Sequence, residues 1–337
     1  MNIVTQTTTK LQKVPQAVRD EINAGPSDAD THRHYMQLAC MNSIEQGGEG
    51  SSSHLPREFR VAAWNLERCL NVKASAKLLA RPDPDIILLS EMDSGMSRTA
   101  QKHTVKRLAS RLNMYYLYGV EFLELDLGSD MDKQYAEDDF NKRGFHGNAI
   151  LSKMPIEDVA MLRFDDHGHW FAGQQVGDCF GQRRVGGRMA LMAIVKTENN
   201  QRLCVVSTHF ESNAGIAGRD RQMFDLVTAA EAFADSDTPI IIGGDLNAGN
   251  NLAHGLTHHA ESFFETAEEH GFHWRGNKTG TTTRPSLLTQ RPERDMKLDW
   301  FCARDIESHF QKIIPALDKT GMPLSDHDVI VSDWSLA

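Results

Sequence analysis

The sequence predicts an α/β protein whose β-sheets are mixed. From Phe59 onward, short apolar runs rich in β-branched residues alternate with stretches of helical spacing, which is typical of α/β proteins. Some apolar runs follow one another directly, and consecutive strands favour antiparallel pairing in the same sheets. The composition agrees, since 40% hydrophobic and 24% charged residues in a chain of 337 residues are typical of a globular protein with a sizeable core.

The apolar runs and their spacing place the elements in order. Short helices are compatible with 10–24 and 31–46, and longer helical patterns cover 74–85, 104–113 and 219–235. Strands are expected at 59–67, 86–93, 114–125, 147–153, 188–197, 202–210, 239–247, 296–303 and 326–337. The segment 160–188 is rich in His, Gly and aromatic residues, and we expect a long loop that borders the functional site.

The first part of the chain differs from the rest. Residues 1–55 are polar and close with the Gly/Ser tract GGEGSSS, so we expect an appendage with a flexible linker before one catalytic domain, 56–337. No apolar run approaches the ~20 residues that span a bilayer, and no secretory signal is recognisable. The five cysteines are scattered without a CxxC pair, which indicates reduced thiols and a cytoplasmic protein.

The net charge limits the kinds of molecule that the protein is expected to bind. A net charge of −10 argues against a protein that grips long stretches of nucleic acid, because neutralising phosphates requires clustered Lys and Arg. Eight acidic residues lie between Glu121 and Asp139, against Lys133 alone, and we expect a solvated loop there. Such a loop would repel a long polyanion.

Polar side chains follow the ends of several predicted strands. In PIIIGGDLNAGN the apolar run stops at two glycines, and Asp245 and Asn247 come next. Gly-Asp-x-Asn is also ordinary turn material, so this stretch alone leaves a purely structural role open. The pattern recurs at Asn65, Glu67, Glu91, His209, Asp299, Ser325, Asp326 and His327. Several carboxylates that converge without partners would cost several kcal/mol, and a bound hard cation is the simplest compensation.

The ligand types narrow the choice of cation. Carboxylate and amide oxygens suit Mg²⁺ or Mn²⁺, and the two candidate histidines are too few and too dispersed for a zinc site. Glu91, assisted by Asn65 or Glu67, fits a Mg²⁺ site. Ser325, Asp326 and His327 cannot form a serine hydrolase triad, because neighbouring side chains on an extended segment point to opposite faces.

Seven motifs occur in a fixed order: WNLE, LLSEMD, GNAILSKMPI, STHFES, GGDLNAG, KLDWF and LSDHDVI. Together they resemble the endonuclease/exonuclease/phosphatase superfamily of Mg²⁺-dependent phosphohydrolases, over about residues 58–337. The resemblance implies a DNase I-like fold. This is a four-layer α/β sandwich, in which two mixed β-sheets pack face to face with helices outside.

The resemblance also implies roles for individual residues. Asn65 and Glu91 would hold the catalytic metal, Glu67 would serve a second metal site, and Asp326 would complete the metal or proton network. These positions agree with the oxygen-rich ligand set inferred above.

A second group would act on the substrate. Asp245 would orient and deprotonate the attacking water, while Asn247 and His209 would contact phosphoryl oxygens. Asp299 would orient His327, which would contact the phosphate or assist the leaving group. In-line displacement at phosphorus needs these functions, because the water must be activated and the developing charge neutralised.

Three further residues are candidates for substrate binding. Asn148 stands where the family often has an apolar residue. Arg183 and Arg184, with Arg188 nearby, could clamp a second phosphate, although exposed arginines are commonly solvated.

The substrate is left open by the sequence. We expect a phosphodiester or phosphomonoester of modest size, hydrolysed with Mg²⁺ or Mn²⁺, and no obligatory protein partner. A nuclease acting on DNA or RNA is the alternative, and an inactive binding module on the same fold is a third interpretation.

Overall fold

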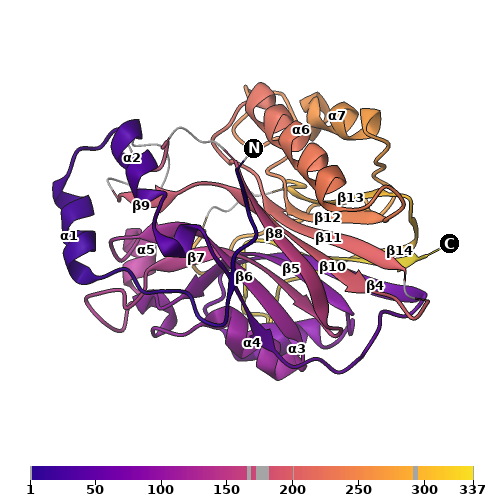
Figure 1. Cartoon of the computed structure of the whole chain (residues 1–337), viewed down its shortest axis with the longest axis horizontal. Helices are drawn as coiled ribbons and strands as arrows, with labels where there is room; N and C mark the ends of the chain where they lie inside the picture. Colours follow the sequence, from indigo (N-terminus) through magenta and orange to yellow (C-terminus); the bar gives the residue numbers. More distant parts are fainter. Residues whose placement is uncertain (1, 165–167, 172–181, 200, 291–294, 337) are drawn as a thin grey trace.

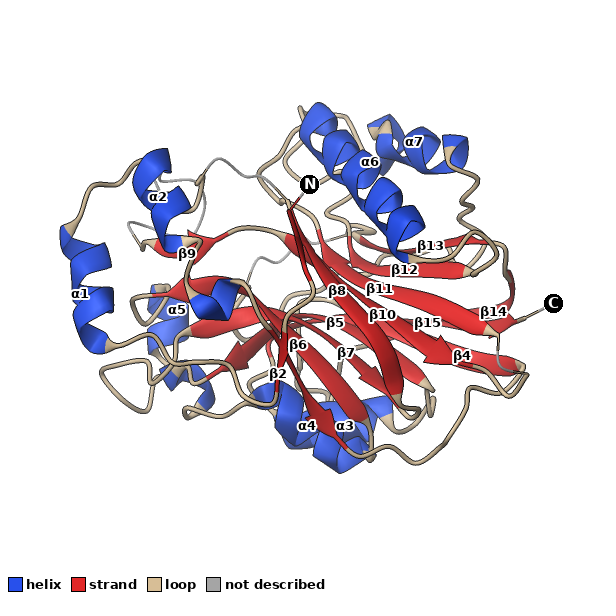
Figure 2. Ribbon diagram, viewed as in Figure 1, coloured by secondary structure: helices blue, strands red, loops and turns tan. Residues whose placement is uncertain are grey.

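The computed structural model describes residues 2–164, 168–171, 182–199, 201–290 and 295–336. Within these residues two β-sheets lie face to face, and helices cover their outer faces (Figures 1 and 2). The predicted four-layer α/β sandwich is therefore confirmed. No helix of the described part is both long and apolar enough to cross a bilayer.

The first sheet has six strands among the described residues, in the order β1-β8-β10-β11-β12-β13. These strands are β1 (Asn2–Val4), β8 (Ile156–Arg163), β10 (Met189–Lys196), β11 (Arg202–His209), β12 (Ile240–Asp245) and β13 (Asp299–Arg304). β11 and β12 are parallel and the other pairs are antiparallel, as expected for a mixed sheet.

The second sheet is larger, with the order β14-β15-β4-β5-β7-β6-β3-β2 in the described residues and with β9 paired to β6. Its strands are β2 (Thr7–Thr8), β3 (Ile44–Gly48), β4 (Glu58–Arg68), β5 (Ile86–Ser94), β6 (Tyr115–Glu124), β7 (Phe145–Ser152), β9 (Arg184–Gly186), β14 (Glu307–Ile314) and β15 (Val329–Ser335). β4 and β5 form a parallel pair in its middle.

Three apolar layers hold the sandwich together. Between the sheets, Val61, Leu88, Leu191 and Ile241 belong to one fully buried cluster. The helices α3 (Val72–Leu79) and α4 (Thr104–Leu112) pack on the larger sheet, and α6 (Ile216–Phe233) and α7 (Phe263–Glu269) pack on the smaller one (Figure 1). Because the central strands are covered on both faces, they carry apolar residues on both faces up to their polar ends, rather than alternating.

The segment before residue 55 is built into both sheets, which corrects the expectation of an appendage with a flexible linker. β1 pairs with β8, and β3 pairs with both β2 and β6. Leu11 and Ile22 are buried in the core. The Gly/Ser tract begins inside β3, where a Cβ on Gly48 would approach the Met114 carbonyl oxygen to 2.4 Å. The segment also buries Leu11, Val14, Ile22 and Met41 in the core, but these apolar residues are too widely spaced to form a run like those of the central strands.

Other differences are local. The helical pattern at 31–46 gives only α2 (Ala29–Tyr35) and a 3₁₀ turn, Ala39–Met41, before β3, and a second helix, α1, spans Gln16–Ala24. The expected loop 160–188 contains the end of β8 and all of β9, and 165–167 and 172–181 lie outside the described residues. The sequence did not predict the strand β14, because its side chains are largely exposed and its residues are mixed in polarity.

Candidate active site

The parallel strand pairs bring polar residues from distant parts of the chain to one place. His209 ends β11, Asp245 ends β12 and Asp299 begins β13, and these three residues are paired side by side in the sheet. Asn65 lies near the end of β4, beside the β5 residue Ser90, and Glu91 follows. The carboxyl ends of parallel strands are a usual place for function in α/β proteins.

Two glycines explain how Asp245 is presented. Ile241 points into the layer between the sheets, and strand alternation therefore turns Asp245 the same way. Gly244 has φ of +149°, and a Cβ there would lie 2.0 Å from the Thr208 carbonyl oxygen. The Gly-Gly pair thus lets β12 approach β11 closely just before the carboxylate.

Left-handed backbone occurs at three of the predicted site residues. Glu67, Glu91 and Asn247 have φ of 42°, 56° and 49°. The pairing of β4 with β5 shifts register between Asn65 and Arg68, which indicates a bulge. Such bulges redirect side chains, and left-handed non-glycine residues are often found at functional sites.

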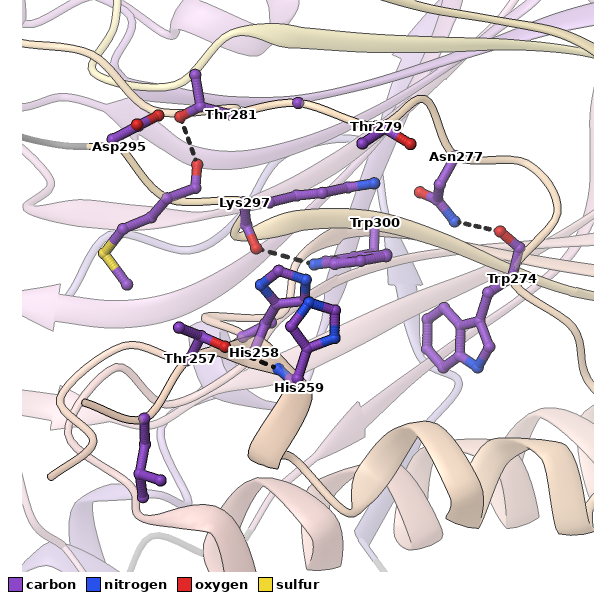
Figure 3. A pocket seen from close by; sticks show the side chains of 15 residues that line it. Thr257, His258, His259, Trp274, Asn277, Thr279, Thr281, Asp295, Lys297 and Trp300 are labelled. Atoms are coloured by element: carbon purple, nitrogen blue, oxygen red, sulfur yellow. Dashed lines mark hydrogen bonds between the residues drawn. The ribbon is translucent and has the colours of Figure 1, made fainter. Parts of the chain in front are cut away.

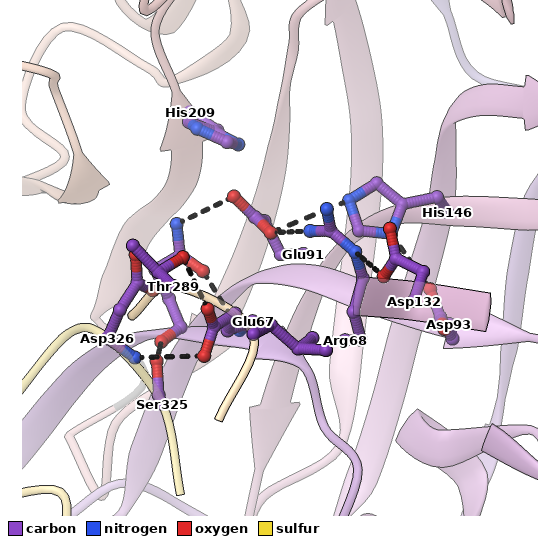
Figure 4. A network of polar contacts seen from close by, with 12 residues as sticks. Glu67, Arg68, Glu91, Asp93, Asp132, His146, His209, Thr289, Ser325 and Asp326 are labelled. Atoms are coloured by element: carbon purple, nitrogen blue, oxygen red, sulfur yellow. Dashed lines mark hydrogen bonds and ion pairs between the residues drawn. The ribbon is translucent and has the colours of Figure 1, made fainter. Parts of the chain in front are cut away.

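Asn65 joins the carboxylates of two different sheets. Its Nδ2 donates to Glu91 Oε1 at 3.1 Å and to Asp245 Oδ2 at 3.0 Å. Glu91 is also paired with the Arg68 guanidinium. Burial alone would raise the pKa of Glu91, but Arg68 foremost, then His209 and His146, hold this pKa well below its usual value. Glu91 is therefore an ionised ligand candidate, and Figure 4 shows its carboxylate facing Arg68.

Glu67 and Asp326 form a second acidic pair. Glu67 accepts hydrogen bonds from the hydroxyls of Ser286 and Thr289 at 2.7 Å each, and from the Asp326 backbone N–H at 3.1 Å. Burial, together with the charge of Asp326, raises the pKa of Glu67 to about 8. A cation bound between these groups would relieve this cost.

His327 is held between three carboxylates. Its Nδ1 lies 2.8 Å from Asp299 Oδ2, and its Nε2 lies 3.6 Å from Asp245 Oδ2 and 3.9 Å from Asp326 Oδ1. Burial alone would lower the pKa of His327, but these carboxylates raise it well above its usual value. Asp245, Asp299 and His327 each offer an atom within 4.8 Å of the others, close enough to hold a metal ion.

His209 is a second histidine beside Asp245, with Nε2 3.5 Å from Asp245 Oδ2. Arg188 lies 2.8 Å from His209 Nδ1 and 2.5 Å from Glu121 Oε1. Arg188 therefore links His209 to Glu121, which is fully buried. Burial alone would raise the pKa of Glu121, but Arg188 and then His209 lower it to about 2.

The prediction of a solvated acidic loop at 121–139 is corrected only in part, because Asp126, Asp130, Glu137, Asp138 and Asp139 are exposed while the other three acidic residues are not. Glu121 and Glu124 belong to β6, Asp132 to the short helix α5 (Asp130–Lys133), and all three are buried. Arg98 pairs with Glu124 at 2.9 Å, so this charge is neutralised internally. The pattern VEFLEL places two acidic residues inside a strand of bulky apolar residues, and this signal could have revealed that Glu121 and Glu124 are buried.

A buried network behind Glu91 was missed from the sequence. His146 Nδ1 lies 2.9 Å from Asp93 Oδ1, and Asp93 accepts two bonds of 2.9 Å from Arg98. Arg68 is held by Asp132 at 3.5 Å as well as by Glu91. The partners of each pair come from different elements, and pairings of this kind have no local sequence pattern.

A cleft of about 120 Å³ opens beside these residues. We call it the acidic cleft, and it is lined by Glu67, Arg68, Glu91, Ser129, Asp132, Arg184, Leu288, Thr289 and Asp326. It therefore contains three of the four predicted metal ligands, and the fourth, Asn65, is bonded to Glu91.

The predicted substrate-binding residues separate in the structure. Arg184 lines the acidic cleft. Arg183 does not reach it, because its Nη1 donates to the carbonyl oxygens of Ile22 and Gly25 at 2.6 and 2.8 Å. Asn148 is fully buried, and its Nδ2 donates to the Met189 carbonyl oxygen at 3.1 Å.

Asn247 shapes the turn after β12. Its backbone N–H donates to Asp245 Oδ1 at 2.9 Å, and its Nδ2 donates to the Phe210 carbonyl oxygen at 3.0 Å. The turn thereby orients the Asp245 carboxylate.

Comparisons with solved structures find the same fold. An endonuclease/exonuclease/phosphatase from Beutenbergia cavernae DSM 12333 is similar with a TM-score of 0.57 and 16% identity, covering 83% of this chain and 72% of that one. The human Nocturnin catalytic domain with bound sulfate gives 0.55 and 16%, over 87% and 97% of the two chains. D. rerio TDP2 complexed with a single strand DNA product gives 0.53 and 16%, over 82% and 99%.

The sequence comparisons are more specific about the family. No curated protein matches the chain. The model of the endonuclease/exonuclease/phosphatase family matches residues 62–327, which run from β4 to the imidazole beside Asp245. Since this match spans both sheets and the cluster between them, the chain belongs to the endonuclease/exonuclease/phosphatase family, whose members are generally phosphoester hydrolases.

Proposed function

We propose that this protein is a Mg²⁺-dependent hydrolase of phosphoester bonds in which Asp245 activates the attacking water. The observation that carries the proposal is the position of the Asp245 carboxylate. Asn65 Nδ2 lies 3.0 Å from its Oδ2, His209 Nε2 lies 3.5 Å away, and His327 Nε2 lies 3.6 Å away. A buried carboxylate surrounded by donors from three other strands or loops is suited to accept a proton next to an anionic phosphate.

The residues present fit a hard divalent cation. Glu91, Asn65, Glu67 and Asp326 would hold it, since they offer oxygen ligands and the Glu67–Asp326 pair is a buried acidic pair that a cation would stabilise. When bound, the metal supplies Lewis acidity and neutralises phosphate charge. Mn²⁺ prefers the same oxygen ligands, so the proposal allows it to replace Mg²⁺ at this site.

The other residues act on the phosphate and its surroundings. The raised pKa of His327 favours the imidazolium at neutral pH, and Asp299 orients it, so that Nε2 can donate a proton or hydrogen bond to the phosphate or the leaving oxygen. His209 contacts a phosphoryl oxygen, and Arg188 and Glu121 position its ring. A phosphate contact from the Asn247 amide requires exchange of its bond to Phe210.

We propose a phosphodiester or phosphomonoester of modest size as the substrate. The acidic cleft is small, and the net charge of −10 disfavours contact with a long polyanion. Arg184 and Arg68 at the cleft would bind a substrate anion next to the scissile phosphate.

The test is a panel of phosphoesters with Mg²⁺, Mn²⁺ or EDTA. The panel contains p-nitrophenyl phosphate, bis-p-nitrophenyl phosphate, a single-stranded oligonucleotide and plasmid DNA. We expect hydrolysis of at least one small ester that either metal supports and EDTA abolishes. If hydrolysis of DNA exceeds that of the small esters by orders of magnitude, the nuclease alternative is correct. If no member of the panel is hydrolysed, the proposed activity is wrong.

A further inference from the structure

A second and larger pocket lies on the outside of the six-stranded sheet. Its volume is about 670 Å³, within the ~300–1,000 Å³ typical of ligand pockets. Side chains of Trp274, Trp300, His258, His259 and Lys297 dominate its walls (Figure 3). We call it the aromatic pocket.

The aromatic pocket is separate from the acidic cleft. Trp300 follows Asp299 in β13, and successive side chains of a strand point to opposite faces. Asp299 bonds His327 between the sheets, whereas Trp300 packs on Phe264 of α7, with ring centroids 4.9 Å apart. Among the residues that the structure describes, none that lines the aromatic pocket also lines the acidic cleft.

The aromatic walls are held in place by their own hydrogen bonds. The Trp274 indole donates to the Phe264 carbonyl oxygen at 3.2 Å and the Trp300 indole to the Lys297 carbonyl oxygen at 3.0 Å. The rings of His258 and His259 lie 4.1 Å apart, and His258 lies 5.4 Å from Trp300. These rings are suited to pack against another planar ring, because rigid aromatic side chains lose little entropy on binding.

The pocket is lined by charged groups of both signs, Lys297 and Asp295. Within the described part of the chain, no carboxylate pairs with Lys297, whose Nζ lies 3.8 Å above the Trp300 ring and donates to the Lys278 carbonyl oxygen at 2.7 Å. Burial lowers the pKa of Lys297 to about 8. Burial, then His259 and Lys297, lower the pKa of His258. An anion bound beside Lys297 would stabilise its charged form, which burial disfavours.

We propose that the aromatic pocket binds a planar aromatic anion of about the size of a nucleoside monophosphate. The ring would pack against the histidines and tryptophans, and the anionic group would contact Lys297. The ligand would not touch Asp245 or His327, since neither is among the described residues that line this pocket.

The test measures binding without turnover. Adenosine 5′-monophosphate is titrated into the full chain in EDTA by isothermal titration calorimetry, with intrinsic tryptophan fluorescence as a second readout. We expect saturable binding with quenching, and binding of adenosine or inorganic phosphate at least about tenfold weaker, because each makes only part of the contacts.

Two variants locate the ligand. Lys297→Gln and His259→Gln should each weaken binding about tenfold, whereas Lys77→Gln on α3 and His254→Gln in the same loop should not. His259 is exposed, so this variant keeps the test valid if Lys297→Gln does not fold. Asp245→Asn should leave the affinity unchanged. The proposal is overturned if binding does not saturate, if adenosine binds as tightly as its monophosphate, or if both pocket variants bind normally.

Discussion

Asp245 is the residue on which most of the proposed chemistry depends. Its carboxylate is buried, and its Oδ1 accepts the Asn247 backbone N–H at 2.9 Å while its Oδ2 faces Asn65 and the two histidines. The geometry separates the two oxygens, so that one is used for structure and the other is available for proton transfer.

Replacing Asp245 with Asn should remove the base and keep the structure. The amide oxygen of Asn can still accept the Asn247 N–H, although its Nδ2 then faces the Asn65 Nδ2 and the bond between these two side chains is lost. A neutral amide cannot take a proton from water. We expect kcat on the best panel substrate to fall about 10²–10⁴-fold with little change in melting temperature. Asp237→Asn, at an exposed position, is the matched control. Near-normal turnover of Asp245→Asn would show that another group activates the water.

Arg68 is the residue that the sequence least suggested. It adopts a left-handed φ of 76°, which favours glycine, and its guanidinium pairs with Glu91 and Asp132. A fixed positive charge on a proposed metal ligand should weaken cation binding, because the two cations repel each other at close range.

Arg68→Gly should therefore tighten Mg²⁺ binding by about tenfold, measured by isothermal titration calorimetry without substrate. The metal-free variant should also be less stable, because Glu91 and Asp132 lose a buried partner. Exposed Arg81→Gly changes the net charge equally and should leave Mg²⁺ affinity unchanged. Unchanged or weaker Mg²⁺ binding in Arg68→Gly would exclude this competition.

At the scale of elements, β3 shows how a polar segment is anchored. Glu45 on β3 accepts hydrogen bonds from the Leu11 backbone N–H at 2.8 Å and the Tyr116 hydroxyl at 3.1 Å, and lies 2.9 Å from His103 Nε2. Burial alone would raise the pKa of Glu45, but His103 foremost, with the other donors, lowers it from 4.5 to about 2. One carboxylate thus joins the N-terminal segment, α4 and β6.

The pKa of Glu45 is lower in the folded than in the unfolded state, so the stability of the fold depends on pH in a defined direction. The stability that ionised Glu45 contributes is fully present above about pH 4.5 and is lost as the pH falls towards 2. Glu45→Gln should cost about 1–3 kcal/mol at pH 7, and the difference from wild type should shrink between pH 4.5 and 2.5. Urea unfolding at several pH values measures this difference, with exposed Glu58→Gln as the control. A pH-independent difference would exclude an ionised Glu45 as the cause.

At the scale of the whole molecule, the first eight residues connect the two sheets. β1 extends the six-stranded sheet, and β2, three residues later, extends the larger sheet (Figure 2). The site lies between these sheets, but its residues come from other strands. The N-terminal strands should therefore matter for stability and not for chemistry.

Deleting residues 2–8 should lower the melting temperature by about 2–6 °C, because two edge pairings are lost. Turnover should be retained at temperatures where the variant is folded. The variant Ile3→Ser changes a side chain that is 43% exposed and keeps the backbone pairing of β1 with β8. It therefore separates the effect of the backbone pairing from that of the side chain. Calorimetry and the phosphoester assay measure the two effects. An unchanged melting temperature after deletion would show that β1 and β2 do not contribute to stability.

The candidate site was only partly predictable. Asn65, Glu91, Asp245 and His327 stand at strand ends marked by apolar runs, and folding brings them together as expected. Whether each performs its proposed role stays a prediction. Arg183 and Arg184 could not be told apart in the chain, yet only Arg184 lines the acidic cleft.

Local patterns were sufficient for the central strands, the helices α3, α4 and α6, and the strand ends that carry the polar residues. Such patterns repeat every two or three to four residues and record which faces are buried. Folding alone decided the places of β1 to β3, the burial of Glu121 and the pairing of Arg68 with Glu91. Edge pairing uses backbone groups that every residue has, and ion pairs join residues far apart in the chain, so neither has a local signature.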